Sequence, residues 1–118
     1  MDAEIFKFRT KQLALRIGKM ADAIPNTRSS SIYAKQIIRS SSSVGANYRA
    51  DCRAKSPADM INKLKIVEEE ADETLYWLEL ITESGLLPEN RLTDLIKETN
   101  EIISMTVASI ITLKSKQK

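Results

Sequence analysis

Four stretches of apolar residues at helical spacing, separated by the only three prolines, constrain the fold more than any other feature. Pro25, Pro57 and Pro88 each lie where the phase of the apolar pattern changes. Proline lacks a backbone donor and clashes with the preceding turn, so helices begin or end beside it. The sequence therefore predicts one domain over residues 1–118, with four helices at about residues 2–24, 29–54, 57–84 and 88–115.

The apolar residues of each segment recur every three or four positions, which places them on one side of a helix. Long helices with short connections bury such stripes by packing side by side. We therefore predict an all-α, antiparallel, up-down four-helix bundle. The residues expected to line its core are Phe6, Leu13, Ile17, Met20, Ile24, Tyr33, Ile37, Val44, Tyr48, Leu64, Val67, Ala71, Leu75, Leu78, Thr82, Leu92, Leu95, Thr99, Ile102, Thr106, Ile110 and Leu113.

A run of small residues interrupts the second predicted helix. Four serines at positions 40–43 precede Val44, Gly45 and Ala46, and serine and glycine are poor helix formers. A break in the helix is one interpretation. We favour a continuous helix, because the apolar spacing from Ile37 continues across the run to Tyr48 and small residues let helices approach closely.

The absence of histidine and the single cysteine, Cys52, exclude much chemistry. Ser-His-Asp and Cys-His nucleophile systems, structural zinc sites and Glu-x-x-His di-iron sites all lack their ligands or bases. No apolar run approaches the roughly 20 residues of a membrane span, and the first residues show no signal-peptide pattern. We expect a cytoplasmic protein that is not an enzyme and has no catalytic residue, metal, cofactor or membrane partner.

Basic side chains gather on the side of the second helix that lies opposite its apolar stripe. Read at 100° per residue, they fall within about 80° of one another. They form a candidate nucleic-acid-binding stripe, to which the first helix adds further cations; the alternative is a solvated face or a subunit contact. The stripe is Lys35, Arg39, Arg49 and Arg53, and the first helix adds Lys7, Arg9, Lys11, Arg16 and Lys19.

The third helix carries a mixed acidic and apolar face that points away from its main stripe. Residues 1–57 hold 11 basic and 4 acidic side chains, whereas residues 58–118 hold 7 and 12. One interpretation is neutralisation between helices of one bundle; the other is a head-to-tail contact between copies, which closes into a ring if the rotation allows. The candidate oligomer interface is Ile66, Glu69, Glu70, Glu73, Trp77 and Leu80.

Three blocks of sequence carry a family resemblance over nearly the whole chain. They are Gln36-Ile37-Ile38-Arg39-Ser40 with Ser43-Val44-Gly45-Ala46-Asn47-Tyr48-Arg49-Ala50; Ser56-Pro57-Ala58-Asp59-Met60-Ile61-Asn62-Lys63-Leu64; and Glu68-Glu69-Glu70-Ala71-Asp72-Glu73-Thr74-Leu75-Tyr76-Trp77-Leu78 with Ser84-Gly85-Leu86. The chain resembles the bacterial four-helix-bundle proteins encoded in intervening sequences of 23S ribosomal RNA genes. A glutamate that is frequent in that family shortly after the Asn47 position is replaced here by Ala50-Asp51.

The resemblance implies an up-down bundle and a ring-shaped homopentamer, as in related accessory proteins of diversity-generating retroelements, which bind a reverse transcriptase and nucleic acid. It implies no known enzyme. Its distinctive motif is structural in our interpretation, with a buried hydrogen bond from Asn47 that fixes helix packing. The motif is Ser43, Val44, Gly45, Ala46 and Asn47.

Two hypotheses for function follow. The first is a non-catalytic, oligomeric, nucleic-acid-associated protein whose partner is RNA, with ribosomal RNA the first candidate. The alternative is a scaffold that binds a protein partner and no nucleic acid. A metal-dependent nuclease that uses Glu69 and Glu73 is a third, disfavoured because carboxylates on one helix usually form a solvated face.

Overall fold

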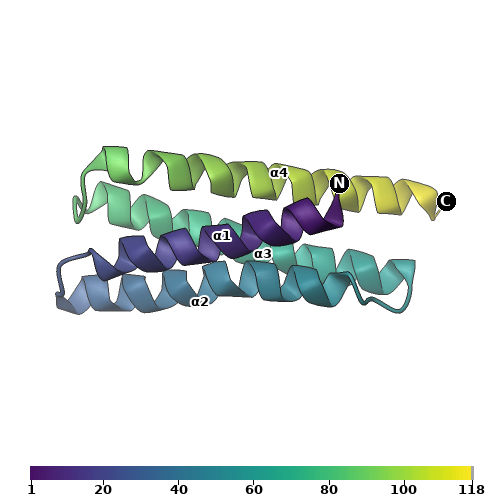
Figure 1. Cartoon of the computed structure of the whole chain (residues 1–118), viewed down its shortest axis with the longest axis horizontal. Helices are drawn as coiled ribbons and strands as arrows, with labels where there is room; N and C mark the ends of the chain where they lie inside the picture. The colour runs from purple at the N-terminus through teal and green to yellow at the C-terminus, as the bar shows by residue number, and fades with distance from the viewer. Residues whose placement is uncertain (118) are drawn as a thin grey trace.

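The protein is a bundle of four antiparallel helices, shown by a computed structural model that describes residues 1–117. The helices are α1 (Ala3–Asp22), α2 (Arg28–Asp51), α3 (Pro57–Glu83) and α4 (Thr93–Lys116), and a short 3-10 helix, η1 (Glu89–Arg91), precedes α4. The bundle measures 49 × 21 × 21 Å and its helices run up and down along the long axis (Figure 1). No strand occurs in residues 1–117, so the predicted all-α fold is confirmed.

Side-chain caps set the beginnings of the first three helices. Asp2, Thr27 and Ser56 each accept a hydrogen bond from the backbone N–H three residues ahead, which satisfies a donor that the first turn leaves free. Pro57 occupies the first position of α3, where its missing N–H costs nothing. These three starts lie within a residue of those that the sequence predicts.

The predicted start of the fourth helix at residue 88 is wrong. Pro88 has an extended backbone, η1 follows it, and α4 begins only at Thr93. Leu87 and Leu92 on either side of this turn are both buried. The chain turns here because anchoring both leucines in the core outweighs the tendency of Pro88 to start a helix.

Buried residues follow a seven-residue repeat. In α3, from Leu64 onward, they alternate by three and four positions, a spacing that keeps one seam facing the bundle axis. Leu75 and Thr82, which the sequence predicts in the core, are only half-buried because they lie one position beyond this seam. The seam residues of α3 are Leu64, Val67, Ala71, Thr74, Leu78 and Ile81.

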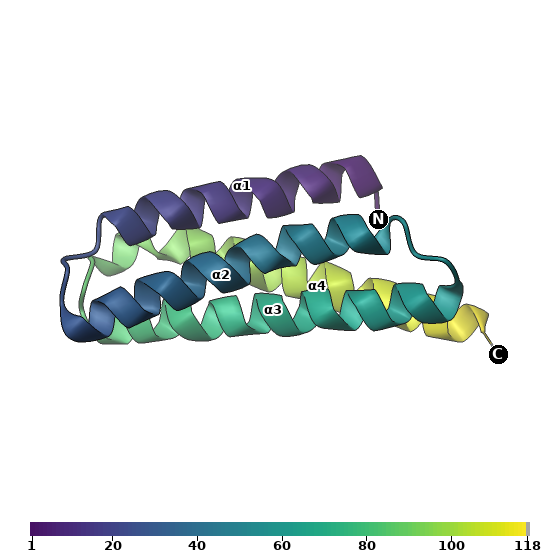
Figure 2. The same cartoon turned by 90° about the horizontal axis from the view of Figure 1, so that it is seen from below.

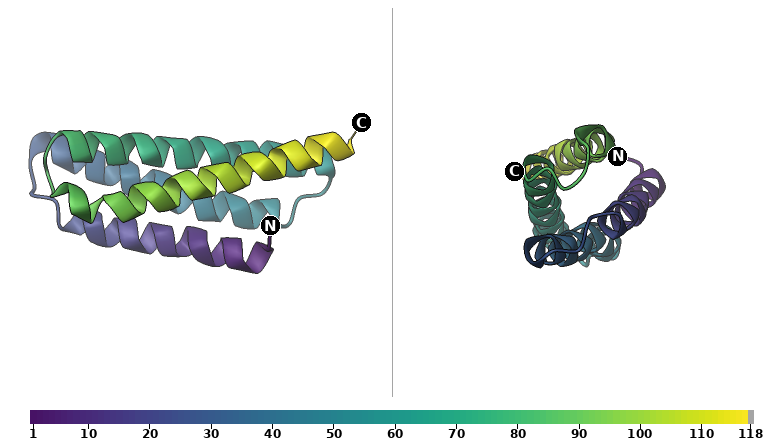
Figure 3. Two further views of the ribbon diagram at one scale, coloured as in Figure 1. Left: turned by 90° about the horizontal axis from the view of Figure 1, so that it is seen from above. Right: turned by 90° about the vertical axis from the view of Figure 1, so that its left-hand side faces the viewer.

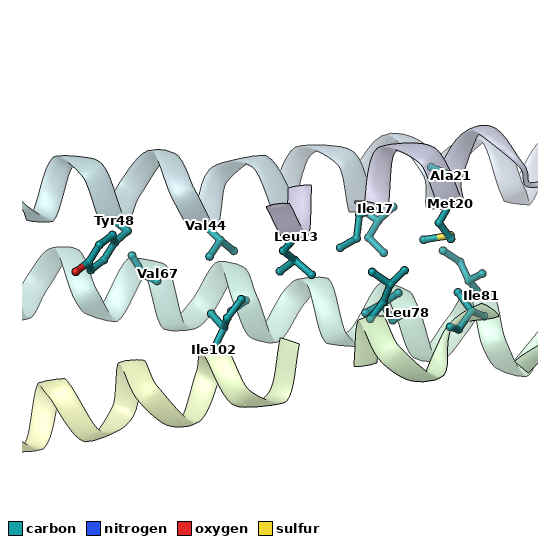
Figure 4. Packing of buried hydrophobic residues seen from close by; sticks show 14 of the residues in the cluster. Leu13, Ile17, Met20, Ala21, Val44, Tyr48, Val67, Leu78, Ile81 and Ile102 are labelled. Carbon is teal, nitrogen blue, oxygen red and sulfur yellow. The ribbon is translucent and has the colours of Figure 1, made fainter. Parts of the chain in front are cut away.

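Side chains from all four helices meet inside the bundle. In Figure 4, Leu13 of α1, Val44 of α2 and Ile102 of α4 extend into the same interior, and each is fully buried. Phe6 and Tyr48 pack edge to face, with ring centroids 4.5 Å apart. One continuous core therefore joins the four helices.

Hydroxyl groups occupy several core positions. Thr10, Thr74, Thr99 and Thr106 are buried, and each hydroxyl donates to the carbonyl four residues earlier. Ser40 lies 2.8 Å from Thr74, oxygen to oxygen, which links α2 to α3. These bonds satisfy groups whose burial would otherwise be costly.

The serine run does not break α2, which continues from Arg28 to Asp51. At Gly45, an added Cβ would lie 3.2 Å from Oγ1 of Thr10, so a small residue here brings α2 close to α1. Figure 2 shows α1 lying along α2. The continuity predicted from the apolar spacing is confirmed.

Candidate functional site

Basic and acidic side chains are concentrated on different helices of the bundle. The helices α1 and α2 together carry 9 basic and 3 acidic side chains, whereas α3 carries 2 and 8, and α4 carries 3 of each. Seen along its long axis, the bundle places its helices at four corners, with α2 adjacent to both α1 and α3 (Figure 3). One side of the molecule is therefore basic and the next is acidic.

Arg39, the centre of the predicted basic stripe, is held by the acidic helix of its own chain. Its guanidinium donates to Glu70 at 3.1 Å and forms a second ion pair with Glu73. The side chain of Gln36 accepts a third bond from it at 3.0 Å. At Arg39, basic α2 and acidic α3 therefore neutralise one another within one bundle, which is the first of the two interpretations of the charge pattern.

The other basic residues of the stripe lie on the α1 side of α2 or on its outer face. Arg49 lines a groove of about 610 Å³ together with Lys7 and Lys11 of α1. Lys35 and Arg53 are exposed. Among residues 1–117, none of Lys11, Lys35, Arg49 and Arg53 forms an ion pair.

The groove, which we call the α1/α2 groove, has small residues along one wall. Ser42, Gly45 and Ala46 of α2 line it, and Phe8 of α1 lies beside them. Glu4 is its acidic residue, and it pairs with Lys7 at 3.3 Å. Lys11 and Arg49, which have no ion-pair partner in the part of the chain that the structure describes, therefore border this groove.

Three of the cations that α1 offers lie on its other edge, toward α4. Arg9 donates to Glu98 at 2.6 and 2.9 Å and to Glu101 at 3.2 Å. The hydrogen bond from Arg9 holds the pKa of Glu98 below its ordinary value. Arg16 and Lys19 lie beside the start of α4, so these three residues are outside the α1/α2 groove.

The candidate oligomer interface on α3 is divided between the surface and the seam with α2. Ile66 is 41% exposed, and Glu69 is exposed. Trp77 is half-buried, packs against Tyr33 of α2 at 6.1 Å between ring centroids, and donates from its indole nitrogen to Glu73 at 3.0 Å. The single chain therefore covers part of the mixed face that points away from the main apolar stripe of α3.

Leu80 is half-buried on the same helix, and Glu70 is half-buried beneath Arg39. Tyr76, which the sequence analysis did not single out, is 54% exposed. The surface of α3 that is free for a partner is therefore centred on Ile66, Glu69 and Tyr76.

The Ser-Val-Gly-Ala-Asn motif lies in the middle of α2. Val44 is fully buried, and Gly45 sits against Thr10 of α1. The Asn47 amide donates to the carbonyl and the hydroxyl of Ser43, both at 2.8 Å. This hydrogen bonding stays inside α2, whereas we had expected a bond between helices; Ala46 is exposed in the groove.

Comparison with known proteins identifies the family. The model of the 23S rRNA-intervening sequence protein family matches residues 3–108. The chain belongs to this family. One similar solved structure, described as a protein with unknown function from the S23 ribosomal protein family of Bacteroides thetaiotaomicron, is 34% identical, with a TM-score of 0.85 over 93% of this chain and 98% of that chain. No curated protein matches the chain.

Membership of the intervening-sequence family agrees with the resemblance drawn from the three sequence blocks. The family model and the solved relative name no reaction. Residues 1–117 contain no group of three or more acidic or cysteine side chains placed to hold a metal ion. In the same part of the chain, no helix has the length and apolar character needed to cross a bilayer.

Sequence reasoning missed two features of this family member. Phe8 and Leu15 of α1 are 64% and 55% exposed. Their seven-residue spacing, which places both on one side of a helix, was the signal for an exposed apolar patch. Asp51 is buried at the end of α2. It follows Val44 by seven residues and Ile37 by fourteen, so the heptad seam of α2 places it inside the bundle.

Proposed function

We propose that the protein is a non-catalytic, RNA-associated bundle that contacts the phosphate backbone along the α1/α2 groove. The observation that carries the proposal is that Lys11 and Arg49, which border this groove beside Lys7, form no ion pair within residues 1–117. Lys35 on α2 and Arg53, two residues beyond its end, are further exposed cations. Membership of a family named for 23S rRNA intervening sequences makes RNA the first nucleic acid to test.

Binding of this kind is electrostatic and depends on shape rather than on base sequence. Lysine and arginine neutralise phosphates, and the released counterions make affinity depend steeply on salt. Sequence-specific RNA recognition uses several aromatic rings on which bases stack, whereas Phe8 is the aromatic residue of the groove. We therefore expect weak discrimination between RNA sequences of the same fold.

We further propose that copies of the chain assemble into a ring, with a pentamer as the resemblance implies. Ile66 and Tyr76 on acidic α3, and Leu15 on basic α1 outside the α1/α2 groove, are exposed large apolar side chains that a neighbouring copy would cover. A contact between two different patches is heterologous, which is the kind that generates rings. Complementary charge on the two helices would steer the encounter.

A charge-reversal experiment tests the RNA proposal. The variant Lys11→Glu/Arg49→Glu/Arg53→Glu should lose binding to a structured ribosomal RNA fragment, measured by fluorescence anisotropy. A matched control, Lys65→Glu/Lys97→Glu/Lys114→Glu, makes the same change in net charge at exposed lysines of α3 and α4. Equal losses in the two variants would mean a net-charge effect, and the groove would have no special role.

A protein-binding scaffold is the second candidate, favoured by the exposed Phe8 and Leu15. Exposed apolar patches commonly mark protein partners. Purification of the protein from its native host distinguishes the two functions. Recovery with RNA supports the first, and recovery with a stoichiometric protein that Phe8→Ser/Leu15→Ser no longer retains supports the second.

A further inference from the structure

A cavity of about 620 Å³ opens at the end of the bundle where α1 begins and α2 ends. In Figure 1 α4 continues beyond the start of α1 at this end. Three of the four methionines, Met1, Met60 and Met105, line the cavity together with Leu64 and Leu113. Methionine is flexible and polarisable, so a wall of this kind adapts to the shape of an apolar guest.

Asp51 contributes a carboxyl group to this cavity. Asp51 is only 5% exposed, and its Oδ1 atom is buried with no hydrogen-bond partner among residues 1–117. Buried polar groups in proteins are almost always paired. Oδ1 of Asp51 is therefore an acceptor that lacks a donor, and it belongs to a residue that lines an apolar cavity.

The charged groups around Asp51 leave it without an internal counter-ion. Asp59 and Lys63 of α3 are the charged neighbours that act on it. The Lys63 ammonium lies 3.7 Å from the carboxylate of Asp59, so the positive charge of the pair is already shared. The three groups together carry a net charge of about −1 at neutral pH, which favours a cation in the cavity.

We propose that this cavity binds a small amphipathic amine, whose ammonium group pairs with the Asp51 carboxylate while its apolar body lies among the methionines. An ammonium supplies the missing donors and the missing charge together, and charged hydrogen bonds are the stronger kind. The volume falls in the range of about 300–1,000 Å³ that small-molecule sites occupy. This site is on a different part of the surface from the α1/α2 groove and does not depend on RNA binding.

Methionine methyl NMR with phenethylamine as the probe tests the proposal on the intact chain. Met1, Met60 and Met105 report on the cavity, and Met20 near the other end of α1 is an internal control. Figure 4 shows Met20 far along the bundle from Tyr48, a residue of the cavity. We expect saturable shifts of Met60 and Met105 with an unmoved Met20, and weaker binding of the neutral analogue 2-phenylethanol.

Two variants assign the effect to one carboxyl. Asp51→Asn should bind phenethylamine at least about tenfold more weakly than the wild type, since it removes a charged hydrogen bond. The variant should also bind the amine and the alcohol with similar affinity. Glu79→Gln removes an exposed carboxylate of α3 that does not line the cavity, and it should keep the preference for the amine. Circular dichroism confirms that each variant is folded.

Three results would overturn the proposal. The first is the absence of saturable methionine shifts with phenethylamine in the wild-type protein. The second is equal affinity of the wild-type protein for phenethylamine and 2-phenylethanol. The third is an unchanged preference for the amine in Asp51→Asn.

Discussion

Replacing Asp51 by asparagine should stabilise the protein at neutral pH, although the substitution lies inside the bundle. Burial is the main cause that raises the pKa of Asp51 from 3.8 to about 6, and the negative charge of Asp59 raises it further, against a smaller opposing effect of Lys63. The folded protein therefore holds a proton on this carboxyl more tightly than the unfolded chain does. At pH 7 folding must bury a carboxylate that lacks a hydrogen-bond partner at Oδ1.

The sign and size of the effect follow from proton linkage. Because the folded pKa is the higher one, the carboxyl opposes folding least below pH 4, and stability falls as the pH rises from about 4 to about 6. The pKa difference of about 2 corresponds to about 3 kcal/mol at pH 7. Asparagine is nearly the same size and stays neutral, so Asp51→Asn should be more stable by about 2–3 kcal/mol at pH 7, and by almost nothing at pH 4.

Urea unfolding monitored by circular dichroism at pH 4, 5, 6 and 7 measures this difference. For a chain of this length, about 2–3 kcal/mol also raises Tm by roughly 10 °C, which a thermal scan detects. Asp59→Asn is the contrasting variant: Asp59 accepts a hydrogen bond from the backbone N–H of Lys55 and pairs with Lys63, so its replacement should not give the gain expected for Asp51→Asn. A variant less stable than the wild type at pH 7, or a gain that is the same at pH 4 and pH 7, would refute the argument that a buried charge opposes folding.

Four further predictions follow from the packing and the charges. If three cations of the α1/α2 groove contact RNA, raising salt from ~50 to ~200 mM should weaken binding by roughly 20- to 40-fold, and a flat anisotropy profile would contradict this. Gly45→Leu should destabilise the bundle by about 2 kcal/mol because α1 lies against this position, whereas Gly18→Leu, where an added Cβ meets nothing within 4 Å, should be neutral or stabilising in urea unfolding. Arg9→Leu should lower the free energy of unfolding by about 1–2 kcal/mol at pH 7. Because the ion pair with Arg9 lowers the pKa of Glu98, this loss should shrink as the pH falls below 4.5, whereas a loss that does not change with pH would assign the effect to packing. Ile66→Glu should lower the mass measured by light scattering without loss of helicity, and an unchanged mass would place the subunit contact elsewhere.

Local signals predicted the elements well where the chemistry that starts a helix is itself local. At Ser56-Pro57, a side-chain cap and a proline at the first helical position coincide, and α3 begins there. At Pro88 the proline has no capping partner, and α4 begins at Thr93 behind Leu92, which has no capping side chain. The burial of Leu92 decides this start, and burial depends on the other three helices.

Positions beside the core were harder to assign than positions within it. Helical periodicity placed Ile37 and Leu78 inside correctly. It placed Trp77 on an outward face, because a single helix does not show which of its flanks a neighbour covers. Tyr33 and Arg39 of α2 occupy that flank, so Trp77 and Glu73 meet partners in the same chain. For the same reason, the sequence could not separate Arg39 from Arg49 as phosphate contacts.

The buried polar groups of the bundle differ in a way that bears on function. Thr74 and Ser40 satisfy one another across the α2/α3 seam, and the core threonines bond to their own helices, so these groups fit a structural role. Asp51 alone has a buried side-chain oxygen or nitrogen without a partner in residues 1–117. A domain of this size has a total stability of about 5–15 kcal/mol, so a carboxyl that costs about 2–3 kcal/mol takes a substantial share of it. Because the same residue borders the methionine-lined cavity, the missing partner and the open space are explained together if a donor from outside the chain completes the site.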